Sequence, residues 1–220
     1  MGISQPITLR ASSAIATPTT EYGVYDTAKK TSTCTSTSAN KLVDTTGLFT
    51  TTDAIAVGDI IKNTTSGKFA LVTAIDSATQ LSVGADIFTN TNAYTIYPGL
   101  GYKLQDLYHE LVVVLDVTAA ATEVGDTLDV YIDTSFDGGV SFVNIGHFTQ
   151  VVGNGGAKKF IMSFKANPIT ASNSVAFGTD QAASAALQIG FGDRLRYRAV
   201  TVDANANASF TYSIKAQAKN

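Results

Sequence analysis

The second half of the chain alternates apolar and polar residues with a period of two, which is typical of β-strands that bury one face. In Thr127–Thr134 the apolar residues Leu128, Val130 and Ile132 share one face, and Asp and Tyr residues share the other. Five further stretches have this character: Glu110–Val117, Phe142–Thr149, Lys159–Phe164, Asp193–Val202 and Asn207–Ala216. Turn-forming residues separate them at intervals of about 10–20 residues, and this spacing predicts an antiparallel β-sandwich. The very apolar run Glu110–Val117 is expected to be a central strand buried on both faces.

Residues 26–102 differ in character, because their apolar runs are shorter and Thr, Ser and Asn are more frequent. Six short strands are predicted there: Thr31–Ser36, Lys41–Asp44, Asp59–Asn63, Phe69–Ile75, Gln80–Val83 and Tyr94–Tyr97. Gly58 and Gly67 fall in the turns that bound two of these strands. Many short strands within one small region predict a small β-barrel, and Pro98–Gly101 has the composition of a linker after it.

The most specific local motif is Ser135–Phe142, which resembles the Asp-box S-x-D-x-G-x-T-W with Ser141 and Phe142 at its last two positions. The aspartate of such a turn accepts hydrogen bonds from backbone N–H groups, and its glycines permit positive φ angles. Sialidases carry repeated Asp-boxes away from their chemistry, and this chain shows one copy only. We therefore predict a structural hairpin turn rather than a glycosidase. The turn is built on Ser135, Asp137, Gly138 and Gly139.

Three arginines, Arg194, Arg196 and Arg198, alternate along one predicted strand and therefore share a face. Asp129 and Asp133 share a face of another strand. Two interpretations stay open: the arginines pair with these carboxylates inside the molecule, or they form an ion-pair surface between subunits. The interface is the working hypothesis. The two aspartates would lie about 13 Å apart along their strand, which is too far for the carboxylate pair of a glycoside hydrolase.

Composition and charge exclude several classes of function. Charged residues make up only 15% of the chain and the net charge is −3, which argues against nucleic-acid binding by bulk electrostatics. No apolar run approaches the length of a membrane span, and the first residues lack the features of a signal peptide, so no membrane association is expected. Cys34 is the only cysteine, which excludes an intrachain disulfide.

Few residues are available for catalysis or metal binding. His109 and His147 are far apart in the sequence, and no Cys cluster is present to complete a zinc site. Asp126, Asp133 and Asp137 lack the spacing of an EF-hand calcium loop. We therefore expect no catalytic residue, no metal site and no cofactor, and we expect that the protein is not an enzyme.

Several short motifs together resemble a family of tailed-bacteriophage virion proteins. They stand at Ala11–Ala14, Leu115–Ala119, Thr127–Val130, Thr134–Gly139, Phe148–Gln150, Leu195–Arg198 and Ser209–Ser213. The resemblance implies an all-β, antiparallel sandwich of the Ig-like or jelly-roll-like kind. Shorter members of the family run almost directly from the first strand into the strand that ends at Leu115–Ala119. We therefore expect an N-terminal arm and first sandwich strand in residues 1–25, an inserted barrel in 26–102 and the main sandwich in 103–220. Asn167–Gly190 is a second insertion, and two interpretations of it stay open: a surface loop, or a loop that contacts a neighbouring subunit.

The resemblance implies a non-enzymatic structural role in the virion, after assembly in the host cytoplasm. The leading hypothesis is a capsid decoration (cement) protein, a homo-oligomer such as a trimer, which binds the major capsid protein or other virion proteins. One alternative is a tail-tube, neck or baseplate protein whose Asn167–Gly190 loop bridges ring layers. Another is a glycan-binding module on the virion surface that uses Tyr94 and Tyr97 of the barrel.

The N-terminal residues are the second candidate interface. A strand or arm from Ile3 to Leu9, with Ile3, Ile7 and Leu9 as its apolar residues, is predicted to add to the sheet edge of a neighbouring subunit.

Overall fold

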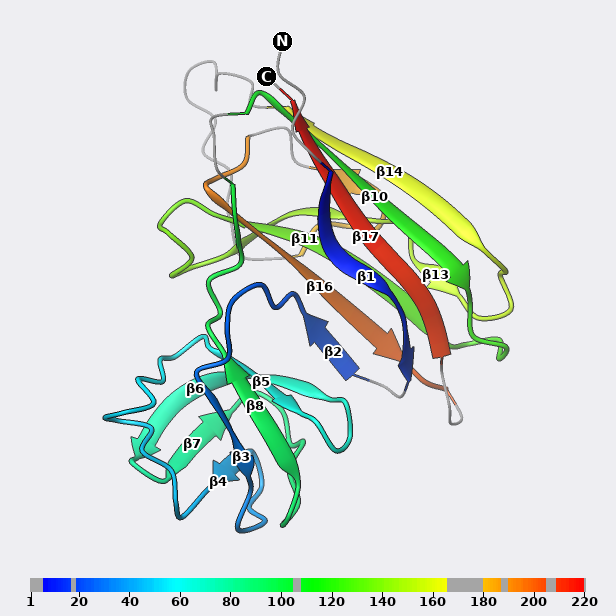
Figure 1. The fold of residues 1–220 in the computed structure, drawn as a ribbon. Helices are drawn as coiled ribbons and strands as arrows, with labels where there is room; N and C mark the ends of the chain where they lie inside the picture. Colours follow the sequence, from blue (N-terminus) through cyan, green and yellow to red (C-terminus); the bar gives the residue numbers. More distant parts are fainter. Residues whose placement is uncertain are drawn as a thin grey trace. The chain divides into compact units, whose positions relative to one another are not determined.

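The computed structural model describes residues 6–16, 19–104, 108–165, 180–186, 190–204 and 209–219, and these form β-strands and no helix. The all-β prediction is therefore confirmed. The chain divides into two compact units. The first unit comprises Met1–Thr19 and Tyr102–Asn220, and the second comprises Thr20–Gly101. Figure 1 shows the strands of both units in the order of the chain.

The first unit contains a four-stranded antiparallel sheet with the strand order β1-β17-β10-β14. These strands are β1 (Ile7–Ala16), β17 (Ser209–Lys219), β10 (Glu110–Ala119) and β14 (Lys158–Lys165). The sheet brings the first and the last strand of the chain together, because β1 pairs with β17 along most of its length (Figure 1). In its interior, Val113 of β10 lies opposite Ala216 on one side and Met162 on the other.

A second sheet has the order β15-β12-β11-β16-β2, and all of its strands except β2, which begins at the boundary residue Thr19, lie within the first unit. Its strands are β15 (Ala185–Ala186), β12 (Val143–His147), β11 (Thr127–Ser135), β16 (Arg194–Val202) and β2 (Thr19–Tyr22). Two short strands join it, since β13 (Val151–Val152) pairs with β11 and β9 (Tyr102–Lys103) pairs with β16. The longest ladder joins β11 and β16 over nine residue pairs, from Thr127 opposite Val202 to Ser135 opposite Arg194.

The two sheets pack face to face as a sandwich, as Gly146 shows most directly. A Cβ atom on Gly146 of β12 would lie 2.4 Å from Met162 Sδ and 2.7 Å from Phe164 Cζ of β14, in the other sheet. Fully buried Leu, Val, Ile, Phe and Tyr residues fill the space between the sheets, and burying each such side chain stabilises the fold by about 1.5–3 kcal/mol.

The strand β10 is central in its sheet but buries only one face. Leu111, Val113, Leu115 and Val117 are fully buried, whereas Val112 and Val114 are only partly covered. The expectation that this strand is buried on both faces was therefore wrong. An antiparallel sheet of a two-layer sandwich has one inner face, so even a Val-rich strand alternates in burial there.

The second unit is a single curled antiparallel sheet with the order β3-β8-β5-β6-β7-β4. Its strands are β3 (Lys30–Thr33), β8 (Ala93–Tyr97), β5 (Ile60–Asn63), β6 (Phe69–Ser77), β7 (Gln80–Val83) and β4 (Lys41–Val43). Strand β6 turns the corner: its first residues pair with β5 and the rest pair with β7, with register shifts on the way. The chain after β3 meets β4 through a bridge between Ser36 and Val43, so the sheet curls back on itself as a small β-barrel.

The interior of this barrel is filled by side chains. Phe49, Leu81, Tyr94 and Ile96 are fully buried members of one apolar cluster. The Tyr94 hydroxyl donates a hydrogen bond to Oδ2 of the equally buried Asp44, at 2.7 Å. Tyr94 therefore has no exposed ring face on which a sugar could stack, which removes one of the two tyrosines that the glycan-binding alternative relies on.

Candidate functional site

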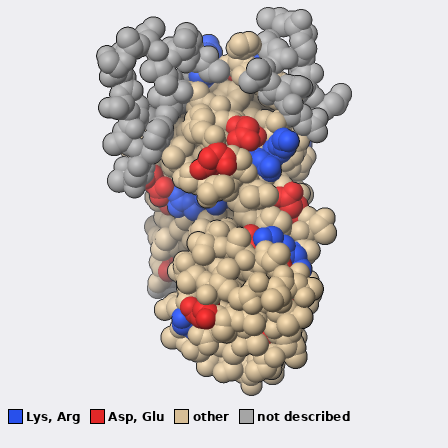
Figure 2. Space-filling model, turned by 90° about the vertical axis from the view of Figure 1, so that its left-hand side faces the viewer, with Lys and Arg blue, Asp and Glu red and all other residues tan. Residues whose placement is uncertain are grey.

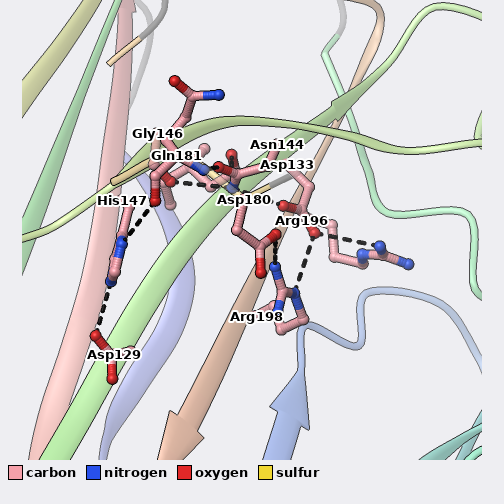
Figure 3. Close-up of polar contacts among 10 residues, drawn as sticks. Asp129, Asp133, Asn144, Gly146, His147, Asp180, Gln181, Arg196 and Arg198 are labelled. Atoms are coloured by element: carbon pink, nitrogen blue, oxygen red, sulfur yellow. Dashed lines mark hydrogen bonds and ion pairs between the residues drawn. The ribbon is translucent and has the colours of Figure 1, made fainter. Parts of the chain in front are cut away.

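The outer face of the sheet that contains β11 and β16 carries a dense network of polar side chains. Figure 3 shows its members converging from β11, β12, β16 and the segment that enters β15. The burial pattern of β11 reveals this network, because residues on both of its faces are covered and not only those of the inner face. Aspartates on the outer face of a sheet stay buried only where other groups cover and hydrogen-bond them.

Asp133 is the centre of one half of the network. It exposes only 3% of its surface, and Arg196 lies directly opposite it in the ladder. Its Oδ2 lies 3.2 Å from Nη2 of Arg196 and 3.8 Å from Nε of Arg198. Its Oδ1 accepts a hydrogen bond of 3.0 Å from Asn144 Nδ2 on the neighbouring strand. The buried carboxylate is thus neutralised by two guanidinium groups.

The guanidinium groups of both arginines also lie over aromatic rings. The guanidinium carbon of Arg196 is 4.0 Å from the centre of the Phe142 ring, and that of Arg198 is 4.2 Å from the centre of the Tyr131 ring. Such cation–π contacts, together with the ion pairs, hold planar guanidinium groups in fixed orientations. The arginines are therefore part of the folded core of this face.

His147 and Asp129 form the other half of the network. Nε2 of His147 lies 2.8 Å from Oδ1 of Asp129, and Nδ1 lies 3.0 Å from the backbone oxygen of Gln181. The ring donates both hydrogen bonds when it is protonated, since both partners offer oxygen acceptors. Gln150 donates to the other oxygen of Asp129 at 2.8 Å, and the imidazole stacks on the Tyr131 ring at 4.1 Å between centres.

The network fastens residues 180–186 onto the sheet. Asp180 forms an ion pair with Arg198, and the backbone N–H of Gln181 donates to Asn144 Oδ1 at 2.9 Å. Ala185 and Ala186 then pair with β12. The charged groups on this face therefore bind one another and hold residues 180–186 against the sheet. Of the predicted contact segment Asn167–Gly190, residues 167–179 and 187–189 lie outside the described residues.

The arginines predicted from the sequence are thus only partly brought together. Arg196 and Arg198 pair with Asp133, which is the intramolecular interpretation, whereas Asp129 binds His147 and Gln150 instead. Arg194 lies at the far end of the ladder, opposite Ser135. A role of these arginines between subunits stays a prediction.

The hairpin tip that follows β11 is the second candidate surface. Asp137 accepts hydrogen bonds from the Ser141 hydroxyl at 2.6 Å, from the Ser141 backbone N–H at 2.9 Å and from the Ser135 hydroxyl at 2.7 Å. These bonds lower the pKa of Asp137 to about 2, with the Ser141 hydroxyl contributing most. Gly138 and Gly139 have φ angles of 76° and 98°, a region that side chains disfavour.

Two apolar side chains at this tip are exposed to solvent. Phe136 is 59% exposed and Val140 is 83% exposed. They flank the hydrogen-bonded core of the turn, so their positions are set before any partner binds. A preorganised apolar tip loses little conformational entropy on binding, which suits it to contact another protein.

The comparisons do not assign a family. No family model, curated protein or solved structure matches this chain. Within the described residues, no helix has the length and apolar character to cross a membrane.

The residues of the predicted N-terminal interface lie in a strand of the chain's own sheet rather than on a free arm. Ile7 pairs with Ala216 of β17, and Leu9 is buried, so both residues belong to the chain's own sheet. Strand β1 is nevertheless the edge of that sheet, so addition of a strand from a neighbour there stays a prediction. Ile3 lies outside the described residues.

Sequence reasoning missed two of the buried polar groups. Arg10 is 7% exposed, donates to the backbone oxygen of Tyr212 at 2.6 Å and lies 3.7 Å from the centre of that ring. The β1–β17 register shifts on both sides of Arg10, a feature that no local pattern predicts. From the sequence, His147 was considered only as a zinc ligand. Its partner Asp129 becomes apparent only once β12 is aligned with β11.

Proposed function

We propose that the protein is a non-enzymatic structural component of a tailed-bacteriophage virion, specifically a capsid decoration protein that binds across capsid subunits. The observation that carries the proposal is the position of the family-like motifs in the fold. They fall on β1, on β10, on β11 and its hairpin tip, between β12 and β13, on β16 and on β17. Every one of these elements belongs to the sandwich unit, so a single domain carries the resemblance.

The surface supports a role in assembly. Figure 2 shows one face on which charged side chains are few and stand in small groups of mixed sign. Protein interfaces are depleted of charge at their centres, because charged groups lose hydration when they are covered. The exposed Phe136 on the preorganised hairpin tip supplies an aromatic anchor for a partner, and the exposed Val140 adds apolar contact area beside it.

The mechanism is mass action. A protein that binds the assembled shell but not its separated subunits stabilises the shell by its binding free energy, about 2.7 kcal/mol per site at a concentration 100 times Kd. Binding of several copies, as a trimer or another homo-oligomer, multiplies this effect at symmetry axes of the capsid.

The first test is the mass of the purified protein in solution, by light scattering after size exclusion, followed by cosedimentation with undecorated heads of the phage that encodes it. A discrete oligomer or monomer that sediments with the heads supports a decoration protein. Growth into open-ended tubes moves the assignment to the tail. A protein that neither sediments with heads nor forms tubes overturns the proposal, and a glycan array then tests the remaining alternative.

A matched pair of variants tests the hairpin tip. Phe136→Ser is expected to reduce head binding by at least tenfold, because it removes an apolar anchor without touching the hydrogen bonds of Asp137. Val57→Ser is the control, since Val57 is a comparably exposed aliphatic residue at 65% exposure in the barrel. Equal binding of both variants would show that the tip is not the contact.

A further inference from the structure

Three carboxylates gather at one end of the sandwich. Glu123 and Asp126 lie in the connection between β10 and β11, and Asp203 directly follows β16. One carboxylate oxygen of each residue lies within 4.8 Å of one carboxylate oxygen of each of the other two. The group therefore brings together chain segments that leave opposite sheets of the sandwich.

Two buried oxygens of the cluster accept no hydrogen bond from the residues that the structure describes. Asp126 exposes only 1% of its surface. Its Oδ1 accepts a hydrogen bond of 3.0 Å from the backbone N–H of Ala204, but its Oδ2 is buried and has no hydrogen-bond partner among the described residues. The same holds for Oε2 of Glu123. Carboxylate oxygens taken out of water without a partner are strongly destabilising, so something else is expected to bind them.

The backbone of Gly153 packs closely against this loop. The N–H of Gly153 donates to the backbone oxygen of Asp126 at 2.7 Å. A Cβ atom on Gly153 would lie 1.8 Å from the backbone oxygen of Glu123 and 3.3 Å from Cβ of Asp126. The absence of a side chain at Gly153 thus lets the two chain segments meet, and it holds the acidic residues at close range.

We propose that Glu123, Asp126 and Asp203 bind one calcium ion. Calcium prefers carboxylate and carbonyl oxygens at about 2.3–2.6 Å, so two of its ligands lie at most about 4.6–5.2 Å apart. The 4.8 Å within which the three oxygens lie meets this requirement. A divalent cation also satisfies the unpartnered oxygens of Asp126 and Glu123 and removes the repulsion among three negative charges. Water and backbone oxygens complete its coordination.

The sequence did not predict this site, because Glu123 and Asp126 are close in the chain but Asp203 is far from both of them in the sequence. Asp126 and Asp203 are brought together by the pairing of β11 with β16, in which Thr127 stands opposite Val202. The ion ties the β10–β11 connection to the end of β16 and thereby links the two sheets. This inference is independent of the proposed virion role.

The test uses the full chain after treatment with EDTA, titrated with CaCl₂ in a calorimeter and in thermal unfolding. We expect saturable binding with a stoichiometry of one and a rise in Tm of about 5–10 °C at a calcium concentration 100 times Kd. Asp126→Asn and Glu123→Gln are each expected to weaken binding at least tenfold. Asp116→Asn is the control, since Asp116 is a more exposed carboxylate paired with Lys159.

The outcomes distinguish a bound calcium ion from a proton that the carboxylates of the cluster share. If Asp126→Asn fails to fold, Glu123→Gln is compared with Asp116→Asn instead, because Glu123 is partly exposed. Absence of binding heat and of a Tm shift at millimolar calcium overturns the proposal, as does equal binding by Glu123→Gln and Asp116→Asn. A chain that is stabilised by mild acid but not by calcium holds a shared proton instead, and this result also overturns it.

Discussion

The sandwich and the barrel each bury an aspartate, but they stabilise its charge in different ways. In the sandwich, Asp133 is 3% exposed and binds the guanidinium groups of Arg196 and Arg198. In the barrel, Asp44 is fully buried and accepts hydrogen bonds from the hydroxyls of Thr46 and Tyr94, at 2.7 Å each. One unit thus compensates a buried negative charge with positive charge, and the other compensates it with neutral donors.

The difference shows in what each aspartate contributes to the fold. Burial alone would raise the pKa of Asp44, but the hydrogen bonds from Thr46, Tyr94 and Ser32 outweigh burial and lower it. Burial of the phenol and, after it, the hydrogen bond to Asp44 raise the pKa of Tyr94. The barrel aspartate therefore organises a turn and one core side chain. The sandwich aspartate instead joins three strands, because its partners come from β12 and β16 while it stands on β11 itself.

The largest effect is expected from Asp133→Ala. Loss of this carboxylate leaves Arg196 and Arg198 without their common partner, and breaking a buried ion pair in this way costs about 3–5 kcal/mol. Urea denaturation measures the change in the free energy of unfolding. Asp116→Ala is the control, because an exposed pair such as Asp116–Lys159 contributes only about 0–1 kcal/mol. Equal losses in both variants would refute the description of Asp133 as the centre of the network.

A substitution of Arg196 distinguishes an intramolecular role of this arginine from a role between subunits. Arg196→Met is expected to destabilise the chain less than Asp133→Ala, because Arg198 and Asn144 still bind the carboxylate. The mass of the assembly is expected to stay unchanged. A variant that keeps the stability of the wild type but loses its oligomeric mass would instead support the interface predicted from the sequence.

In the barrel, Tyr94→Phe tests the neutral compensation of Asp44. Removing one donor to a buried carboxylate is expected to cost about 1.5–3 kcal/mol at neutral pH. Asp44 has a lowered pKa in the folded state, so its stabilisation is present above the ordinary value of 3.8 and is lost as the pH falls through the folded value. Tyr94→Phe is therefore expected to move acid unfolding to higher pH.

The control for the shift in acid unfolding is a substitution in the sandwich unit. Phe148 is a buried ring of the sandwich, and Phe148→Leu changes packing without removing a hydrogen-bond donor. It is expected to lower stability at all pH values without displacing the acid midpoint beyond that loss. If the stability of Tyr94→Phe and that of Phe148→Leu depend on pH in the same way, the hydrogen bond to Asp44 does not control unfolding at acid pH.

Much of the strand pattern was predictable from the sequence, whereas the polar networks were not. The alternation in Thr127–Thr134 identifies β11 and its inner face, because that signal is local. The burial of Asp129 and Asp133 on the outer face depends on which strands lie beside β11 and on what covers them. Charge alternation along β16 predicted a shared face but left its partner open, since register between strands 63 residues apart is a property of the whole fold.

The smallest effect is expected at the hairpin tip, where the carboxylate is exposed. Ser141→Ala removes the hydroxyl that does most to lower the pKa of Asp137, so that pKa is expected to rise from about 2 toward its ordinary 3.8. The titration of the Asp137 carboxyl carbon by NMR measures this shift directly. Because the folded value is the lower one, the stabilisation from Asp137 is present above pH 3.8 and lost as the pH falls toward 2. An unchanged titration would mean that the backbone N–H of Ser141 and the Ser135 hydroxyl are sufficient to hold the Asp137 carboxylate, and the tip would then differ from the barrel, where loss of one donor, Tyr94, is expected to shift acid unfolding.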